Sequence, residues 1–71
     1  MKQSKQYRID YDVAHCFIDT AIVTATSKAE AQRKIRADRR TRPYKIVSIN
    51  EITPEQVETL SKYYRDMKVI A

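Results

Sequence analysis

The most restrictive feature of this 71-residue chain is that it contains no glycine. Phosphate-binding P-loops, dinucleotide fingerprints and nucleophile elbows all depend on glycine for tight turns and close backbone approach. The GXXG loop of KH domains and the glycine-containing RNP1 motif of RRM domains are excluded for the same reason. Contacts with an anion must therefore come from side chains or a helix N-terminus, and every turn must form without glycine.

The first third of the chain predicts a β-hairpin. Apolar and charged residues alternate over residues 7–13, which is the two-residue period of a half-buried strand, and a second β-rich run covers residues 17–25. Closure by residues 14–16 would place Val13 opposite Phe17 and direct the apolar side chains of both strands to one face. The residues predicted on this face are Tyr7, Ile9, Tyr11, Val13, Phe17, Ala21, Val23 and Ala25.

A helix is predicted after the hairpin. Ser27 and Glu30 have the spacing of a capping box, in which Ser27 is the N-cap and the Glu30 side chain bonds back to the Ser27 amide. The helix should extend to about Arg40, because Pro43 disfavours helical geometry at Arg42.

A third strand and a second helix complete the predicted fold. Residues 44–52 are rich in isoleucine and valine, and residues 53–56 combine an N-cap, a proline at the first helical position and a second capping box. An apolar stripe follows at helical spacing, formed by Val57, Leu60, Tyr64 and Met67. We therefore predict one small α+β domain over residues 1–71, with an ordered core over about residues 6–67. Its three-stranded sheet has the element order ββαβα, with two helices packed on one face. We expect the first strand to lie between the other two, and the third strand to run parallel to the second.

The net positive charge of the chain comes from residues 28–45. This segment holds eight Lys and Arg residues against Glu30 and Asp38, a balance of +6, whereas the remaining residues sum to −1. A concentrated basic segment is typical of surfaces that bind polyanions. Three of its arginines, Arg33, Arg36 and Arg40, fall within about 60° of one another on the predicted helix. The candidate binding residues are Arg33, Arg36, Arg39, Arg40, Arg42, Tyr44 and Lys45, with Lys34 as a further candidate.

Two functions are compatible with this basic segment. The first is nucleic-acid binding, mainly through phosphate contacts and with little sequence specificity, in which Tyr44 could stack on an unpaired base. The alternative is a protein–protein interaction module, such as a small regulator or inhibitor encoded by a phage or mobile element, that docks an acidic surface of a larger partner. The same charges are also compatible with a solvated helix end, because cations in the last turn complement the helix dipole.

A second surface predicts self-association. The sheet face opposite the predicted core carries the candidate oligomer residues Ile18, Ile22, Val47 and Ile49. Apolar residues on an otherwise polar face favour burial against a second copy or another protein. We therefore expect a homodimer or a larger homo-oligomer.

No arrangement of residues predicts catalysis, a cofactor or a metal site. His15 and Cys16 are adjacent, so their side chains diverge on an extended chain, and the chain has no second His or Cys to complete a dyad or a zinc site. Asp10 and Asp12 share a strand face and could ligate a cation through oxygen atoms, although a solvated strand face explains them better. We expect a protein that is not an enzyme and that holds no cofactor.

Cysteine usage and hydropathy predict the location. The single cysteine permits no internal disulfide, and no apolar run approaches the ~20 residues that span a bilayer. Residues 1–7 lack the apolar segment of a secretion signal. We expect a cytoplasmic protein that does not contact a membrane.

The order of the predicted elements resembles that of a known family. The runs that carry the resemblance are Tyr7-Arg8 through Ala25-Thr26-Ser27, then Glu30-Ala31, Lys34-Ile35 and Tyr44-Lys45-Ile46-Val47-Ser48-Ile49. Their ββαβ pattern is similar to that of the small archaeal ribosomal protein called LX, and it covers most of the chain. LX-type sequences use glycine around the helix end, which this chain lacks. The resemblance implies an order of strands and helix, and no function.

Overall fold

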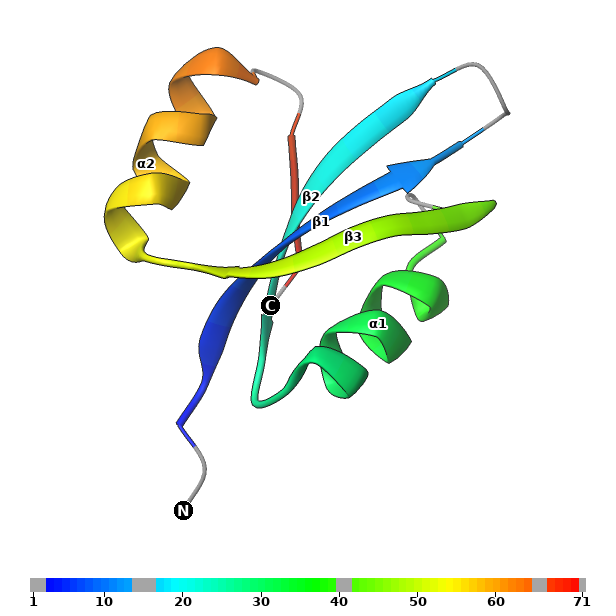
Figure 1. The fold of residues 1–71 in the computed structure, drawn as a ribbon, viewed down its shortest axis with the longest axis horizontal. Helices are drawn as coiled ribbons and strands as arrows, with labels where there is room; N and C mark the ends of the chain where they lie inside the picture. Colours follow the sequence, from blue (N-terminus) through cyan, green and yellow to red (C-terminus); the bar gives the residue numbers. More distant parts are fainter. Residues whose placement is uncertain (1–2, 14–16, 40–41, 65–66, 71) are drawn as a thin grey trace.

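The computed structural model describes residues 3–13, 17–39, 42–64 and 67–70. These residues form a sheet with the strand order β3-β1-β2-β4 and two helices (Figure 1). The α+β class is therefore confirmed. The predicted strand number was wrong, because the sheet has four strands instead of three.

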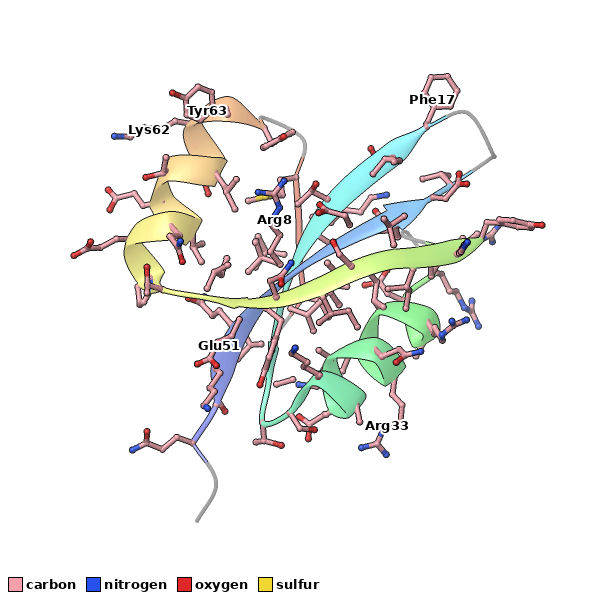
Figure 2. All side chains as sticks on the ribbon, viewed as in Figure 1. Arg8, Phe17, Arg33, Glu51, Lys62 and Tyr63 are labelled. Carbon is pink, nitrogen blue, oxygen red and sulfur yellow. The ribbon has the colours of Figure 1, made fainter. Side chains whose placement is uncertain are left out.

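The predicted hairpin is present. Strands β1 (Lys5–Asp12) and β2 (Ile18–Ala25) pair antiparallel in the expected register, with Tyr7 opposite Val23. The Val13 amide donates to the Phe17 carbonyl at 3.0 Å, and the connecting residues 14–16 lie outside the described residues. Phe17 was wrongly predicted in the core: it is 68% exposed, because it lies at the tip of the hairpin where neither helix covers it (Figure 2).

Strand β3 (Lys45–Ile52) pairs antiparallel with β1, so β1 lies between β2 and β3 and β3 runs in the direction of β2, as predicted. The register shifts between Asp10 and Tyr11. As a result, Ile49 lies opposite Ile9 and Ile46 lies opposite Tyr11, and both isoleucines pack against the core. An extra residue in one strand exchanges the faces of the residues beyond it, so periodicity alone placed Ile49 on the wrong face.

Helix α1 (Lys28–Ala37) covers the predicted core face. Ala31 and Ile35 are fully buried on it. The core that they join comprises Tyr7, Ile9, Tyr11, Ala21, Val23, Ala25 and Ile70. The helix ends earlier than predicted, with Asp38 as the C-cap, since aspartate is a weak helix former and its charge is unfavourable at a helix C-terminus.

Helix α2 (Pro54–Tyr63) begins with the predicted Thr53–Gln56 capping box and with proline in its first turn. It lies across the sheet from α1, so the prediction that both helices share one face was wrong (Figure 1). Ile22 explains the difference. Ile22 is fully buried, and its backbone partner in β1 is Arg8. Arg8 lines a surface cavity together with Leu60 of α2, so α2 lies over the sheet face that carries Arg8 and Ile22.

Strand β4 (Lys68–Ile70) was not predicted, because the ordered core was expected to end near residue 67. It pairs parallel with β2, with Ile70 opposite Val23. Ile70 is 9% exposed and belongs to the core. A three-residue strand is too short for periodicity to reveal, and it forms only because β2 offers a free edge. Neither of the helices in the described part of the chain has the length and apolar character required to cross a membrane.

Candidate functional site

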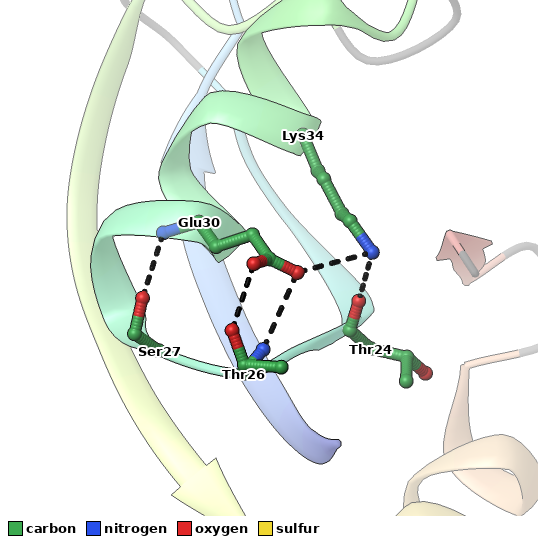
Figure 3. Close-up of polar contacts among 5 residues, drawn as sticks. All are labelled: Thr24, Thr26, Ser27, Glu30 and Lys34. Atoms are coloured by element: carbon green, nitrogen blue, oxygen red, sulfur yellow. Dashed lines mark hydrogen bonds and ion pairs between the residues drawn. The ribbon is translucent and has the colours of Figure 1, made fainter. Parts of the chain in front are cut away.

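The start of α1 is held by a compact set of polar contacts (Figure 3). The Ser27 hydroxyl accepts from the Glu30 amide at 3.2 Å, which confirms Ser27 as the N-cap. The Glu30 carboxylate accepts from the Thr26 hydroxyl at 2.7 Å and from the Thr26 amide at 3.4 Å. Glu30 was predicted to bond the Ser27 amide, but Thr26 offers two donors to the same carboxylate. The hydrogen bond from the Thr26 hydroxyl is the main reason that the pKa of Glu30 lies below its usual value.

Lys34 is part of this structural cluster and not of a free basic surface. Its ammonium group donates to the Thr24 carbonyl at 2.7 Å and lies 3.5 Å from a Glu30 carboxylate oxygen (Figure 3). These contacts hold α1 against the end of β2. The prediction that Lys34 extends the binding surface was therefore wrong.

Five of the cations that were predicted to bind are exposed, and we call them the cationic surface: Arg33, Arg36, Arg39, Arg42 and Lys45. Within the described residues, none of the five forms an ion pair. The Arg33 side chain points away from the sheet (Figure 2). Arg40, which was predicted with this group, lies outside the described residues. The cationic surface is therefore free to pair with an anion from outside the chain.

The cationic surface spans the end of a helix and the following loop. Arg33 and Arg36 lie on α1, Arg39 follows the C-cap, and Lys45 begins β3. Arg42 has a φ of 40°, in the left-handed region that favours glycine, and its amide donates to the Asp38 carbonyl at 3.4 Å. A non-glycine residue in this region raises the conformational free energy by about 1 kcal/mol, so Arg42 occupies a position where glycine would be less strained.

Tyr44 lies between Arg42 and Lys45 in sequence and is 60% exposed. Its amide donates to the Asp12 carbonyl at 2.8 Å, which fixes its backbone to the end of β1. An aromatic ring thus lies next to the cationic surface on an anchored backbone, as a stacking residue requires.

The predicted oligomer face is not one surface. Ile18 and Val47 are 65% and 53% exposed, as a contact face requires. Ile22 is fully buried, and Ile49 packs against the core on the other side of the sheet. The prediction was wrong for Ile22 because α2 covers its face, and for Ile49 because of the register shift in β3.

A partly buried carboxylate network was not predicted. Asp10 accepts from Thr20 Oγ1 at 2.7 Å, from Ser48 Oγ at 3.0 Å and from Arg8 Nε at 3.2 Å. Burial raises its pKa, but these hydrogen bonds and the Arg8 charge outweigh burial, so the pKa of Asp10 lies below its usual value. The carboxylate joins three strands, and its oxygens are already used. This explains Asp10 better than the cation site that its spacing to Asp12 suggested.

In the part of the chain that the structure describes, no three His, Cys, Asp or Glu side chains gather where they could hold a metal ion. His15 and Cys16 lie outside the described residues.

Comparison with known proteins gives no assignment: no protein-family model, no curated protein and no solved structure matches the chain significantly. The chain's chemistry is therefore the basis for any statement about function.

Proposed function

We propose that this protein is a non-catalytic nucleic-acid-binding protein that contacts phosphate groups through the cationic surface. The observation that carries the proposal is the group of five exposed cations, none of them in an ion pair within the described residues, in a segment whose charge balance is +6. A clustered positive surface attracts the closely spaced charges of a nucleic-acid backbone, and it does so with strong salt dependence.

The residue types favour phosphate over other anions. Four of the five cations are arginines, whose planar guanidinium groups can donate two parallel hydrogen bonds to one phosphate. The exposed Ala29 and Ala37 leave room on α1 for a bulky strand to approach. The contacts supply affinity and orientation but do not distinguish bases, so we expect little sequence specificity. Tyr44 would add stacking where a base is unpaired.

An acidic protein surface is the rival ligand, and charge alone does not separate the two. The test measures binding of fluorescent duplex DNA, duplex RNA and single-stranded DNA at 50 mM salt, and of a polyglutamate peptide as an acidic polypeptide. We expect all three nucleic acids to bind within about tenfold of one another, because each presents phosphates, and we expect the peptide to bind more weakly.

The variant Arg33/Arg36/Arg39→Glu should abolish this binding, because it replaces three exposed cations with anions. Lys62→Glu is the control: Lys62 is also exposed, but it lies on α2, far from Arg33 (Figure 2). Circular dichroism of each variant shows whether the fold is retained. Equal binding by the triple variant, or preference for the peptide over every nucleic acid, would refute the proposal.

A further inference from the structure

One end of the sheet brings two aromatic residues together that are far apart in sequence. The Val13 amide donates to the Phe17 carbonyl at 3.0 Å, and the Tyr44 amide donates to the Asp12 carbonyl at 2.8 Å. Asp12 and Val13 are neighbours where β1 ends, so Phe17 and Tyr44 lie on either side of the same point of that strand. Neighbouring strands are about 4.8 Å apart, which places the two backbones about 10 Å from each other.

Both aromatic side chains are open to solvent. Phe17 is 68% exposed and Tyr44 is 60% exposed. The Phe17 ring points away from the sheet at the tip of the hairpin (Figure 2). Ile18, which follows Phe17, is 65% exposed and adds apolar surface at the same end. Single exposed apolar residues are normal in a soluble protein, but a group of them in one place indicates a binding surface.

The cationic surface borders the two aromatic residues. Lys45, which belongs to that surface, and Ile18 are both paired with Asp12, on opposite sides of β1. These three residues form a row across the sheet. Phe17 and Tyr44 come directly before the two outer residues of this row in the chain. The backbone pairing of the sheet therefore places both rings beside the cationic surface.

The combination of rings and cations selects the ligand. A second copy of the chain would cover the rings, but it would bring two cationic surfaces together in a protein whose net charge is already +5. A single-stranded nucleic acid satisfies both features, because its phosphates are anionic and its unpaired bases have flat faces on which aromatic side chains stack. In a duplex the bases are already stacked on one another, so only the phosphates are available to this surface.

We propose that Phe17 and Tyr44 form a stacking site for two unpaired bases of a single-stranded nucleic acid. This site rests on the proposed function, in which the cationic surface holds the phosphates, and it adds the class of strand that binds. The site is also compatible with similar affinities for duplex and single strand. Each phosphate contact contributes a salt slope of about −0.7 on a single strand instead of −0.9 on a duplex, and stacking offsets this loss.

The first experiment separates bases from phosphates. Fluorescence anisotropy at 50 mM salt compares a labelled decamer of thymidine nucleotides with a decamer whose sugars carry no bases. The thymidine decamer should bind at least about tenfold more tightly, since two stacked bases should each add about fivefold or more.

Phe17→Ala and Tyr44→Ala should each weaken binding of the thymidine decamer about fivefold or more and leave duplex binding nearly unchanged. Phe17→Leu should lose as much as Phe17→Ala, because it keeps apolar bulk but not the ring. Tyr63→Ala is the matched control: Tyr63 is 80% exposed and lies on α2, far from Phe17 (Figure 2). This control should bind every ligand like wild type.

The second experiment observes the stacking directly. The chain contains no tryptophan, so Phe17→Trp introduces a single fluorescent reporter at the site and keeps an aromatic ring there. The thymidine decamer should quench this fluorescence, whereas the base-free decamer and the duplex should leave it nearly unchanged. Circular dichroism of each variant shows whether the fold is retained.

The results separate the stacking site from the proposed function. Equal binding of the two decamers by wild type, or wild-type binding of the thymidine decamer by the Phe17/Tyr44→Ala double variant, would overturn the stacking site while duplex binding still supported the proposed function. Quenching by the thymidine decamer without binding of the duplex or the base-free decamer would support the stacking site and contradict the proposed function. A wild-type dimer in light scattering that Phe17→Ala dissociates would overturn the stacking site in favour of a second copy.

Discussion

The cationic surface gives a quantitative prediction for the salt dependence of DNA binding. Each protein cation that neutralises a phosphate of duplex DNA contributes about −0.9 to the slope of log K against log salt concentration. The cationic surface has five exposed cations, none of them in an ion pair within the described residues, so full engagement of this surface gives a slope of about −4.5. Raising the salt concentration from 50 to 200 mM should then weaken binding about 500-fold.

Removing cations should reduce the slope by a countable amount. Arg36→Ala should lower its magnitude by about 0.9, and Arg33/Arg36/Arg39→Ala should leave a slope of about −1.8. Lys34→Ala should leave the slope nearly unchanged, because Lys34 already bonds the Thr24 carbonyl and Glu30. This contrast shows whether the salt slope depends on which cations are exposed or only on how many cations the segment contains.

Fluorescence anisotropy with a labelled 20-base-pair duplex, at five or more salt concentrations, measures these slopes. Lys62→Ala serves as the control for loss of one exposed charge outside the surface, and its slope should equal that of wild type. A wild-type slope shallower than about −2, or a Lys34→Ala effect as large as that of Arg36→Ala, would refute the reasoning.

Three further predictions concern stability. Asp10→Ala should lower the free energy of unfolding by about 2–4 kcal/mol in denaturant titrations, because it leaves three donors unpaired, whereas the exposed Asp19→Ala should change it by less than about 0.5 kcal/mol. The pKa of Asp10 is lowered in the folded protein, so its contribution to the free energy of unfolding is complete above the usual value of 3.8 and is lost as the pH falls through the folded value. The free energies of unfolding of wild type and Asp10→Asn should therefore converge in acid. A difference between them that stays constant with pH would contradict this. Ile70→Ala should cost about 2–4 kcal/mol by thermal melting, and the half-exposed Val69→Ala less than about 1 kcal/mol; equal effects would show that β4 adds nothing to the core.

The local features of this protein were predictable from sequence. The hairpin register followed from the alternation of residues 7–13 together with a connection of residues 14–16, because this pairing brings the apolar side chains of both strands to one face. Both helix starts followed from their N-cap residues, because capping is a bond between a side chain and a backbone amide three positions away. The exposure of Arg33 and Arg36 followed from their helical spacing relative to the buried Ala31 and Ile35.

Features that depend on distant residues were missed. The network around Asp10 joins side chains from three strands, and Ser48 is 38 positions away from it in sequence. Lys34 looked like a free cation because its acceptor, the Thr24 carbonyl, depends on how α1 docks against β2. The position of Phe17 at the same end of the sheet as Tyr44 had no signal in the sequence, where Phe17 looked like an ordinary core residue.

The sequence by itself determined the elements and their charged and apolar faces, because periodicity and capping act over a few residues. Tertiary structure decided the side of the sheet on which α2 lies, the register shift that moved Ile49 into the core, and the addition of β4. Each of these depends on which surfaces remain uncovered once the hairpin and α1 have packed, and burial of Ile22 and Ile70 is a property of the assembled sheet.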